Sequence, residues 1–198
     1  FHGAIYLAHR TQGEIQWRAL RAAGFFGGLT ILSFAAAGLW LWLAIPGYVI
    51  QSAVDGAALP NPLGKTVIRE AGAWFANYRA QPATAALPLA GIAGVLAAQM
   101  LARRGRTLAA FWASALAIAG IIGTAGAALF PFVMPSSLDP NASLTVWDSV
   151  SSQLTLNIML WATLIFMPLI VLYTSWAYRV MGGKVTPAYV RENSHSAY

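Results

Sequence analysis

The sequence predicts an all-α membrane protein in which four transmembrane helices follow the end of a preceding helix. Hydrophobic residues make up 58% of the 198 residues, charged residues only 9%, and the mean hydropathy is +0.61. A soluble domain carries about 25% charged residues, so this chain could not cover a surface that faces water. Four uncharged runs are each roughly 20 residues or longer, the length that crosses the hydrocarbon core of a bilayer as a helix. These runs are too long and continuous for the strands of a membrane barrel.

The chain opens with the apolar stretch FHGAIYLA, which has neither a Met nor the basic start of a signal peptide. We interpret residues 1–21 as the end of a truncated transmembrane helix and a basic loop, and the chain as a piece of a longer protein. The predicted spans cover residues 22–45, 83–102, 108–134 and 154–178. The first span ends at Pro46-Gly47, a pair that stops helices. Pro88 and Pro168 predict kinks in the second and fourth spans.

Small residues predict where two spans touch. In the third span they recur every four residues, at Ala115, Ala119, Gly123 and Ala127, and Gly120 and Gly126 widen this smooth face. The second span offers Gly91 and Gly94. Such faces let two helices approach closely in lipid. We therefore expect the glycines to serve helix packing within a four-helix bundle.

The charged residues sort by loop. Nine of the twelve Lys and Arg residues lie in residues 9–21, 103–107 and 179–198. The positive-inside rule predicts that these two loops and the tail are cytoplasmic, and that loops 46–82 and 135–153 face outward. Topology therefore explains the formal net charge of +6, and no nucleic-acid partner is expected because no base-stacking platform accompanies the basic residues.

The outer loop 135–153 contains no cation and has the chemistry of turns and caps. Asp139-Pro140-Asn141 predicts a turn, and the Thr145-x-x-Asp148 pattern predicts the cap of a short helix. Trp147 is placed to lie at headgroup depth. We expect this loop to be a fixed cap, with Asp139, Trp147 and Asp148 as structural or interface residues.

The other outer loop contains a segment with helical spacing, TVIREAGAWFANYRA at residues 66–80. Its aromatic residues Trp74, Phe75 and Tyr78 fall on one side of such a helix. An interfacial helix that rests these rings on lipid headgroups is the structural interpretation. Contact with a quinone or a partner is the functional alternative.

Few residues of the spans can carry chemistry. No Asp, Glu, Lys or Arg lies inside the predicted spans, although such residues mark proton relays and ion paths. Asn157 is the costliest polar group to bury, and we expect it to bond to a neighbouring helix. His2 is interpreted as a packed or interfacial histidine, with haem ligation as the alternative. There is no cysteine, phosphate loop or nucleophile elbow, so we assign no catalytic, cofactor or metal site to this chain.

The stretch FPFVMPSSLDPNASLTVWDSVSSQLTLNIML, residues 130–160, resembles the C-terminal region of subunit II of the cytochrome bd-type quinol oxidases, including the cyanide-insensitive group. GAIYLAHRTQGE is similar to the segment that closes the family's fourth helix. MPLIVLYTSWAYRVMGGKVT and RENSHSAY are similar to its last helix and its ending. Together these segments span essentially the whole chain.

The resemblance implies that the chain is the second half of a subunit of about eight helices, built as two four-helix halves. It implies a catalytic partner, the haem-bearing subunit I with haem b and haem d, in a complex that oxidises quinol and reduces O2 in aerobic respiration. Subunit II would bind no haem, assemble and stabilise subunit I, and hold a quinone in a groove that faces lipid. The implied location is the bacterial cytoplasmic (inner) membrane.

Two other function classes stay open at this point. Kinked helices and repeated bundles also occur in secondary transporters, so half of a secondary membrane transporter is the alternative. A transporter is expected to pair broken helices with polar groups at mid-membrane, where these spans offer only Asn157 and hydroxyl groups. A structural assembly protein without a ligand is the third possibility.

Overall fold

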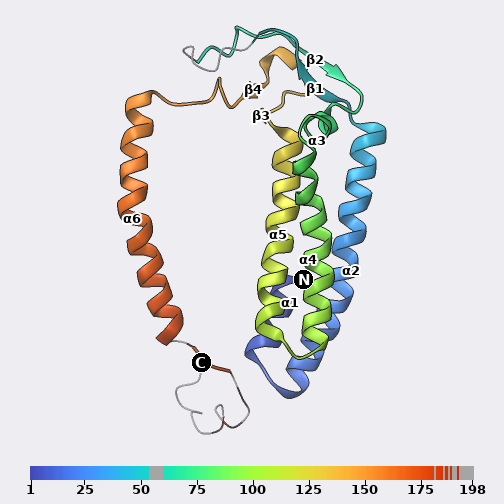
Figure 1. The fold of residues 1–198 in the computed structure, drawn as a ribbon, viewed down its shortest axis with the longest axis vertical. Coiled ribbons are helices and arrows are strands. Elements are labelled where there is room, and N and C mark those ends of the chain that lie inside the picture. Colours follow the sequence, from blue (N-terminus) through green and yellow to red (C-terminus); the bar gives the residue numbers. More distant parts are fainter. Residues whose placement is uncertain (54–59, 181, 185, 187, 189–190, 192–198) are drawn as a thin grey trace.

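The structure, a computed structural model, describes residues 1–53, 60–180, 182–184, 186, 188 and 191. Part of the loop 46–82 and most of the ending RENSHSAY lie outside the described residues. Four helical segments are long and apolar enough to cross a membrane (Figure 1). They are α2 (Gly13–Ala44), the joined η2 (Pro82–Ala85) and α4 (Ala86–Arg103), α5 (Thr107–Leu129) and α6 (Gln153–Val180). The predicted fold class, an all-α membrane protein with four spans, is confirmed.

The first span starts earlier than predicted. A short helix α1 (His2–Arg10) leads through Thr11 and Gln12 directly into α2 at Gly13, so the predicted basic loop at residues 9–21 is wrong. Glu14 lies in the first turn of α2, where a carboxylate suits the helix dipole, and it pairs with Arg18 at 2.6 Å. The polar start of α2 is therefore a helical extension of the span beyond its apolar part.

The third span ends earlier than predicted. α5 stops at Leu129 because Pro131 has no backbone N–H and restricts the residue before it. Residues 132–134 form strand β3 (Phe132–Met134), which pairs antiparallel with β4 (Leu144–Thr145). Between these strands lies the short 3-10 turn η3 (Pro140–Ala142).

The predicted interfacial helix at residues 66–80 is wrong in its first part. β1 (Gly47–Ile50) and β2 (Val67–Glu70) form an antiparallel pair in which Val49 faces Ile68. β-Branched residues in both segments favour the strands. The positive φ of Gly72 ends the extended segment. The chain then forms η1 (Ala73–Phe75) and the short helix α3 (Ala76–Ala80).

α4 and α5 make the closest helix contact of the bundle. A Cβ atom added to Gly94 would lie 2.8 Å from the backbone nitrogen of Ala117, and one added to Gly120 would lie 2.7 Å from the carbonyl oxygen of Leu87. The glycines thus let the two backbones touch, which in lipid supplies packing that side chains cannot. The predicted packing role of the glycines holds for Gly94 and Gly120.

The predicted row of small residues on α5 lies only partly on the contact face: a Cβ added to Gly123 would lie 2.9 Å from the Leu87 side chain of α4, but Ala119 lies off this face. Ala119 is exposed, whereas Ala110, Ala117 and Gly120 are buried. With 3.6 residues per turn, a four-residue step drifts by about 40° around the helix. A mixed spacing of three, four and seven residues stays on one face, and this face meets α4.

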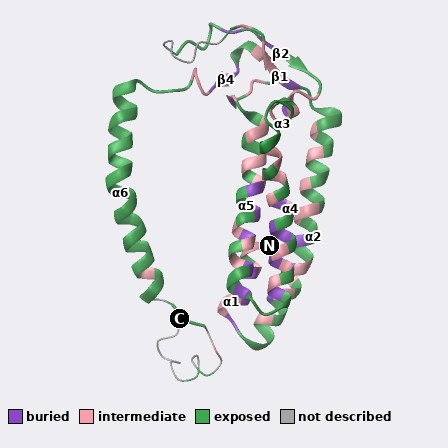
Figure 2. Ribbon diagram, viewed as in Figure 1, coloured by how far each residue is buried: buried purple, intermediate pink, exposed green. Residues whose placement is uncertain are grey.

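The fourth span stands apart from the other three (Figure 1). α6 is exposed along almost its whole length, and none of its most apolar window is buried within the chain (Figure 2). The expectation that all four spans form one bundle is therefore wrong. The bundle consists of α2, α4, α5 and α1, whose buried residues include Ile5, Ala23, Ala102 and Ala110.

We predict that Gly120→Ala destabilises the bundle by about 1–3 kcal/mol, because the new methyl group would overlap the backbone of α4. Thermal unfolding of the purified protein in detergent measures this loss. Gly126→Ala on the same helix is the matched control, since a Cβ there meets nothing within 4 Å. Equal stability of the two variants would contradict the close α4–α5 contact.

Candidate functional site: the loop cap

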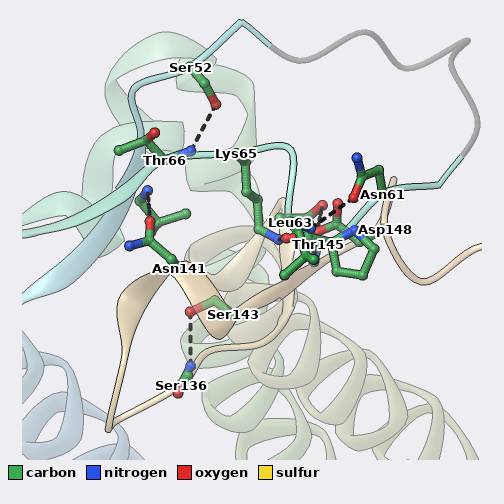
Figure 3. Close-up of polar contacts among 12 residues, drawn as sticks. Ser52, Asn61, Leu63, Lys65, Thr66, Ser136, Asn141, Ser143, Thr145 and Asp148 are labelled. Atoms are coloured by element: carbon green, nitrogen blue, oxygen red, sulfur yellow. Dashed lines mark hydrogen bonds and ion pairs between the residues drawn. The ribbon is translucent and has the colours of Figure 1, made fainter.

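The connections at the end of the bundle opposite the α1–α2 turn form one unit, which we call the cap and define as residues 46–53, 60–81 and 130–152. Its centre is an ion pair between Lys65 Nζ and Asp148 Oδ2 at 2.7 Å (Figure 3). The two side chains are only 4% and 9% exposed. Lys65 also donates to the carbonyl oxygen of Pro62 at 2.8 Å. Two loops that are distant in sequence are thus joined through a buried pair of opposite charges.

Thr145 provides two further hydrogen bonds to the Asp148 carboxylate. Its backbone N–H and its hydroxyl both donate to Asp148 Oδ2, at 2.9 and 2.7 Å. The predicted Thr-x-x-Asp contact is therefore present. No helix begins at this pattern within the described residues, so the expectation of a short capped helix is wrong. Residues 146–148 form a turn, and the carboxylate faces Lys65 instead of a helix end.

The charge environment keeps Asp148 ionised. Burial by itself raises the pKa of this carboxyl, but the Lys65 ammonium and the hydrogen bonds from Thr145 outweigh burial and hold the pKa below its ordinary value. A buried ion pair adds little net stability over an apolar pair, whereas removal of one partner leaves an uncompensated buried charge. The pair therefore makes the two loops depend on each other.

Further hydrogen bonds connect the loop 46–82 to the loop 135–153. Asn141 Oδ1 accepts from the backbone N–H of Val67 at 2.9 Å, and Tyr48 donates its hydroxyl to the carbonyl of Ser136 at 2.8 Å. Asp139 stays within its own turn, where its carboxylate accepts from the backbone N–H of Asn141 at 2.9 Å. The predicted turn at Asp139 is confirmed, and its place in the cap is to position Asn141.

The cap is also fastened to the end of α5. Asn77 donates to the carbonyl of Ala127 at 2.8 Å, and Tyr78 donates to the carbonyl of Thr124 at 2.7 Å. The first of these carbonyls belongs to the last turn of the helix, where carbonyls lack helical partners. Trp147 is half-buried and packs edge-on against Phe130, with ring centroids 6.1 Å apart. By donating to the carbonyl of Ala127, Asn77 acts as a C-terminal cap of α5.

Three of the four residues singled out from the sequence, Asp139, Trp147 and Asp148, come together in the cap. The fourth, Asn157, lies on α6 and is exposed, and its side-chain amide forms no hydrogen bond within the described part of the chain. Sequence reasoning missed Lys65. The signal that could have found it is charge complementarity, because Lys65 is a cation in one loop and the other loop holds acids but no cation.

A groove of about 730 Å³ opens beside the cap, between α2, α4 and α5. Its walls are aromatic and aliphatic, with Phe34, Trp40 and Trp42 among them. The polar groups that line it are engaged elsewhere, since Thr124 donates its hydroxyl to the carbonyl of Gly120 at 2.7 Å and Tyr78 donates to a carbonyl of α5. The groove can therefore hold an apolar chain, but its lining offers few free hydrogen-bonding groups for a polar headgroup.

The described residues hold no cluster of three or more His, Cys, Asp or Glu side chains that could bind a metal ion. His2 Nδ1 forms a hydrogen bond of 2.7 Å with the Ser114 hydroxyl, and the ring centroids of His2 and Phe111 lie 4.8 Å apart. These contacts are those of a histidine of α1 that packs against α5.

Four apolar spans with a bundle of three of them and a hydrogen-bonded cap define a multi-pass α-helical membrane protein. Residues 1–181 match the model of the family described as cytochrome bd terminal oxidase subunit II, and the chain belongs to this family. Membership supports a location in the bacterial inner membrane. The transporter alternative is not favoured.

Two relatives show how much of a family member this chain represents. It is 46% identical over 196 residues to cytochrome bd-I ubiquinol oxidase subunit 2 of Escherichia coli strain K12, which covers 99% of this chain and 52% of that protein. It is 38% identical over 197 residues to the probable cytochrome oxidase subunit 2 of Haemophilus influenzae, again with 52% of the relative covered. The chain therefore spans about half the length of the curated relatives it matches.

We predict that Lys65→Met or Asp148→Leu alone destabilises the protein by about 3–5 kcal/mol, because each leaves a buried charge unpaired. The double variant should lose clearly less than the sum of the two single losses, since no charge stays behind. Thermal unfolding of all four proteins gives the coupling energy. Additive losses would show that the two side chains do not act as a pair.

The lowered pKa of Asp148 predicts a dependence on acid. A carboxyl whose pKa is lower in the folded state contributes stability that is fully present above its unfolded pKa and is lost as the pH falls through the folded pKa. Stability measured against pH should therefore fall less steeply in this acid window for Asp148→Asn than for the parent protein. An acid dependence of stability as steep in Asp148→Asn as in the parent protein would contradict the assignment.

Proposed function

We propose that this chain is a structural, non-haem-ligating part of subunit II in a cytochrome bd-type quinol:O2 oxidoreductase. In this proposal haem b and haem d belong to a partner, the haem-bearing subunit I, and the present helices assemble and stabilise that partner. Family membership and the apolar character of the spans support this division of labour. Three segments are assigned to the cytoplasmic side: the α1–α2 junction with the polar start of α2 (residues 9–21), the α4–α5 loop (residues 103–107) and the tail (residues 179–198).

The observation that carries the need for a partner is the uncovered α6. The side-chain amide of Asn157 on this helix has no hydrogen-bond partner within the described residues, and an unsatisfied amide in hydrocarbon is costly. Pro168 removes the backbone donor that the carbonyl of Leu164 would otherwise use. Leu164 follows Asn157 by about two helical turns, so both polar groups lie on one face. Lipid tails cannot satisfy them, whereas a neighbouring protein helix can.

The groove between α2, α4 and α5 supports a second part of the proposal, a bound quinone. Its volume of about 730 Å³ and its apolar lining suit an isoprenoid tail, and such pockets bury most of a ligand of this size. Because its polar side chains are committed to backbone carbonyls, the groove would hold the tail and leave the quinone ring outside. This would be a structural quinone and no site of catalysis.

The test is purification of the full-length protein from its native membrane through a tag, followed by a reduced-minus-oxidised spectrum and extraction of quinone. We expect haem b and haem d bands, quinol-dependent O2 uptake and co-extracted quinone. Asn157→Leu should lower the amount of haem recovered per tagged chain, because the partner helix loses its polar contact. Asn157→Gln keeps the amide and should recover part of it. A colourless preparation would overturn the proposal, and haem without quinone would remove its second part.

A further inference from the structure

The end of the bundle opposite the cap concentrates positive charge. The α1–α2 turn, the α4–α5 loop and the end of α6 lie at this end (Figure 1). The described cations on these segments and on the tail after α6 are Arg10, Arg18, Arg21, Arg103, Arg104, Arg106, Arg179, Lys184 and Arg191. The described part of the same segments holds one acid, Glu14, which is already paired with Arg18. The cap, in contrast, balances its cations with acids.

Three of these cations sit in a tight and well-defined loop. Gly105 takes a φ of +75°. The backbone N–H groups of Arg104 and Arg106 donate to the carbonyls of Met100 and Leu101, in the last turn of α4, at 3.2 and 2.9 Å. The loop is therefore built as a continuation of the helix end. The side chains of Arg103, Arg104 and Arg106 are exposed, and none forms an ion pair or hydrogen bond with the rest of the described chain.

Neighbouring elements extend the same basic surface. His9 Nδ1 lies 3.0 Å from the Thr107 hydroxyl, so the end of α1 is joined to the start of α5. Arg10 follows directly and donates to the carbonyl of Gly183 at 3.1 Å, which brings the chain after α6 to the same place. Burial lowers the pKa of His9 most, and the positive charges of Arg10 and then Lys184 lower it further.

An aromatic side chain marks the depth of this surface. The guanidinium of Arg21 lies 4.6 Å from the ring centroid of Trp17, and Trp17 is 55% exposed. Trp is enriched where a membrane meets water, with its ring at headgroup level. The arginines of the α4–α5 loop flank two spans at the same end. We infer from this position at the ends of two spans that these cations lie near the lipid phosphates, outside the hydrocarbon.

A solvated basic face that only directs topology is the simpler reading of such charge. It does not account for three exposed guanidinium groups in one loop that no acid of the described residues pairs with. We propose that the surface formed by Arg103, Arg104 and Arg106, with Arg10 beside it, binds the headgroup of an anionic phospholipid. Guanidinium groups bind phosphate oxygens through two parallel hydrogen bonds, and basic pockets between helix ends recognise anionic headgroups in this way.

The test uses the full-length protein in its native complex, delipidated in detergent and titrated with phosphatidylglycerol or phosphatidylcholine while bound lipid is counted by native mass spectrometry. We expect preferential binding of phosphatidylglycerol that weakens with salt. R103Q/R104Q/R106Q should lower its affinity by about fivefold to a hundredfold, since each basic residue near an anionic surface contributes a factor of about five. R69Q/R79Q at the opposite end is the matched control and should change nothing at this site.

Two further variants keep the outcome decisive. R103K/R104K/R106K retains the charge and should keep binding better than the glutamine variant, although below the parent. R104Q alone serves where the triple variant fails to assemble and should lose about fivefold. Unchanged phosphatidylglycerol binding in the glutamine variants, or equal binding of phosphatidylcholine, would overturn the proposal. Displacement of the lipid by inorganic pyrophosphate at equal concentration would overturn its lipid specificity.

Discussion

The buried pair of Lys65 and Asp148 is the interaction on which the cap depends. Neither charge could stay inside the cap alone, because a lone buried ion is strongly unfavourable. The pair therefore requires both loops to be in place at once. Residues 149–152 continue from this point to α6, whose helix is exposed along nearly its whole length. The pair thus fixes the place from which the fourth span leaves the bundle.

The cap and the bundle solve the same problem by different means. In the spans the helical backbone satisfies itself, and glycines let α4 and α5 touch without any polar contact. In the cap the strand pairs are short, so side chains must satisfy the backbone. The Asn141 side chain accepts from the backbone N–H of Val67, and the Asn77 side chain donates to the backbone carbonyl of Ala127. Loss of such a side chain would orphan a main-chain group, and this explains why the loop is rich in Asn, Ser and Thr.

The fold was predictable as far as bilayer physics dictates it. Uncharged runs of spanning length identify four helices whatever their neighbours are. The extension of α2 to Gly13 and the end of α5 at Leu129 were missed because hydropathy reports where lipid begins, whereas Glu14 and Pro131 decide where the helix does. The contact face of α5 was misplaced by reading a four-residue spacing as one face of a helix with 3.6 residues per turn.

The candidate site was predictable only on one of its two sides. The turn and cap chemistry of Asp139 and Asp148 is local, so residues two or three apart reveal it. The partner Lys65 is separated from Asp148 by a complete helical hairpin, and only the fold brings it near. The same holds for β2, where pairing with β1 overrides a helix-like spacing. The position of α6 could not be predicted from this sequence, because α6 packs against no other helix of the described chain.

The two ends of the molecule treat positive charge in opposite ways. At the cap, Lys65 is 4% exposed, and the counter-charge comes from Asp148 of the same chain. At the other end the arginines of the α4–α5 loop are exposed, and Glu14 is occupied by Arg18. Charges that are exposed at a membrane surface can take their counterions from lipid, whereas a buried charge cannot. Internal neutralisation therefore belongs to the end that needs a fixed shape, and external neutralisation to the end whose cations the bilayer itself can satisfy.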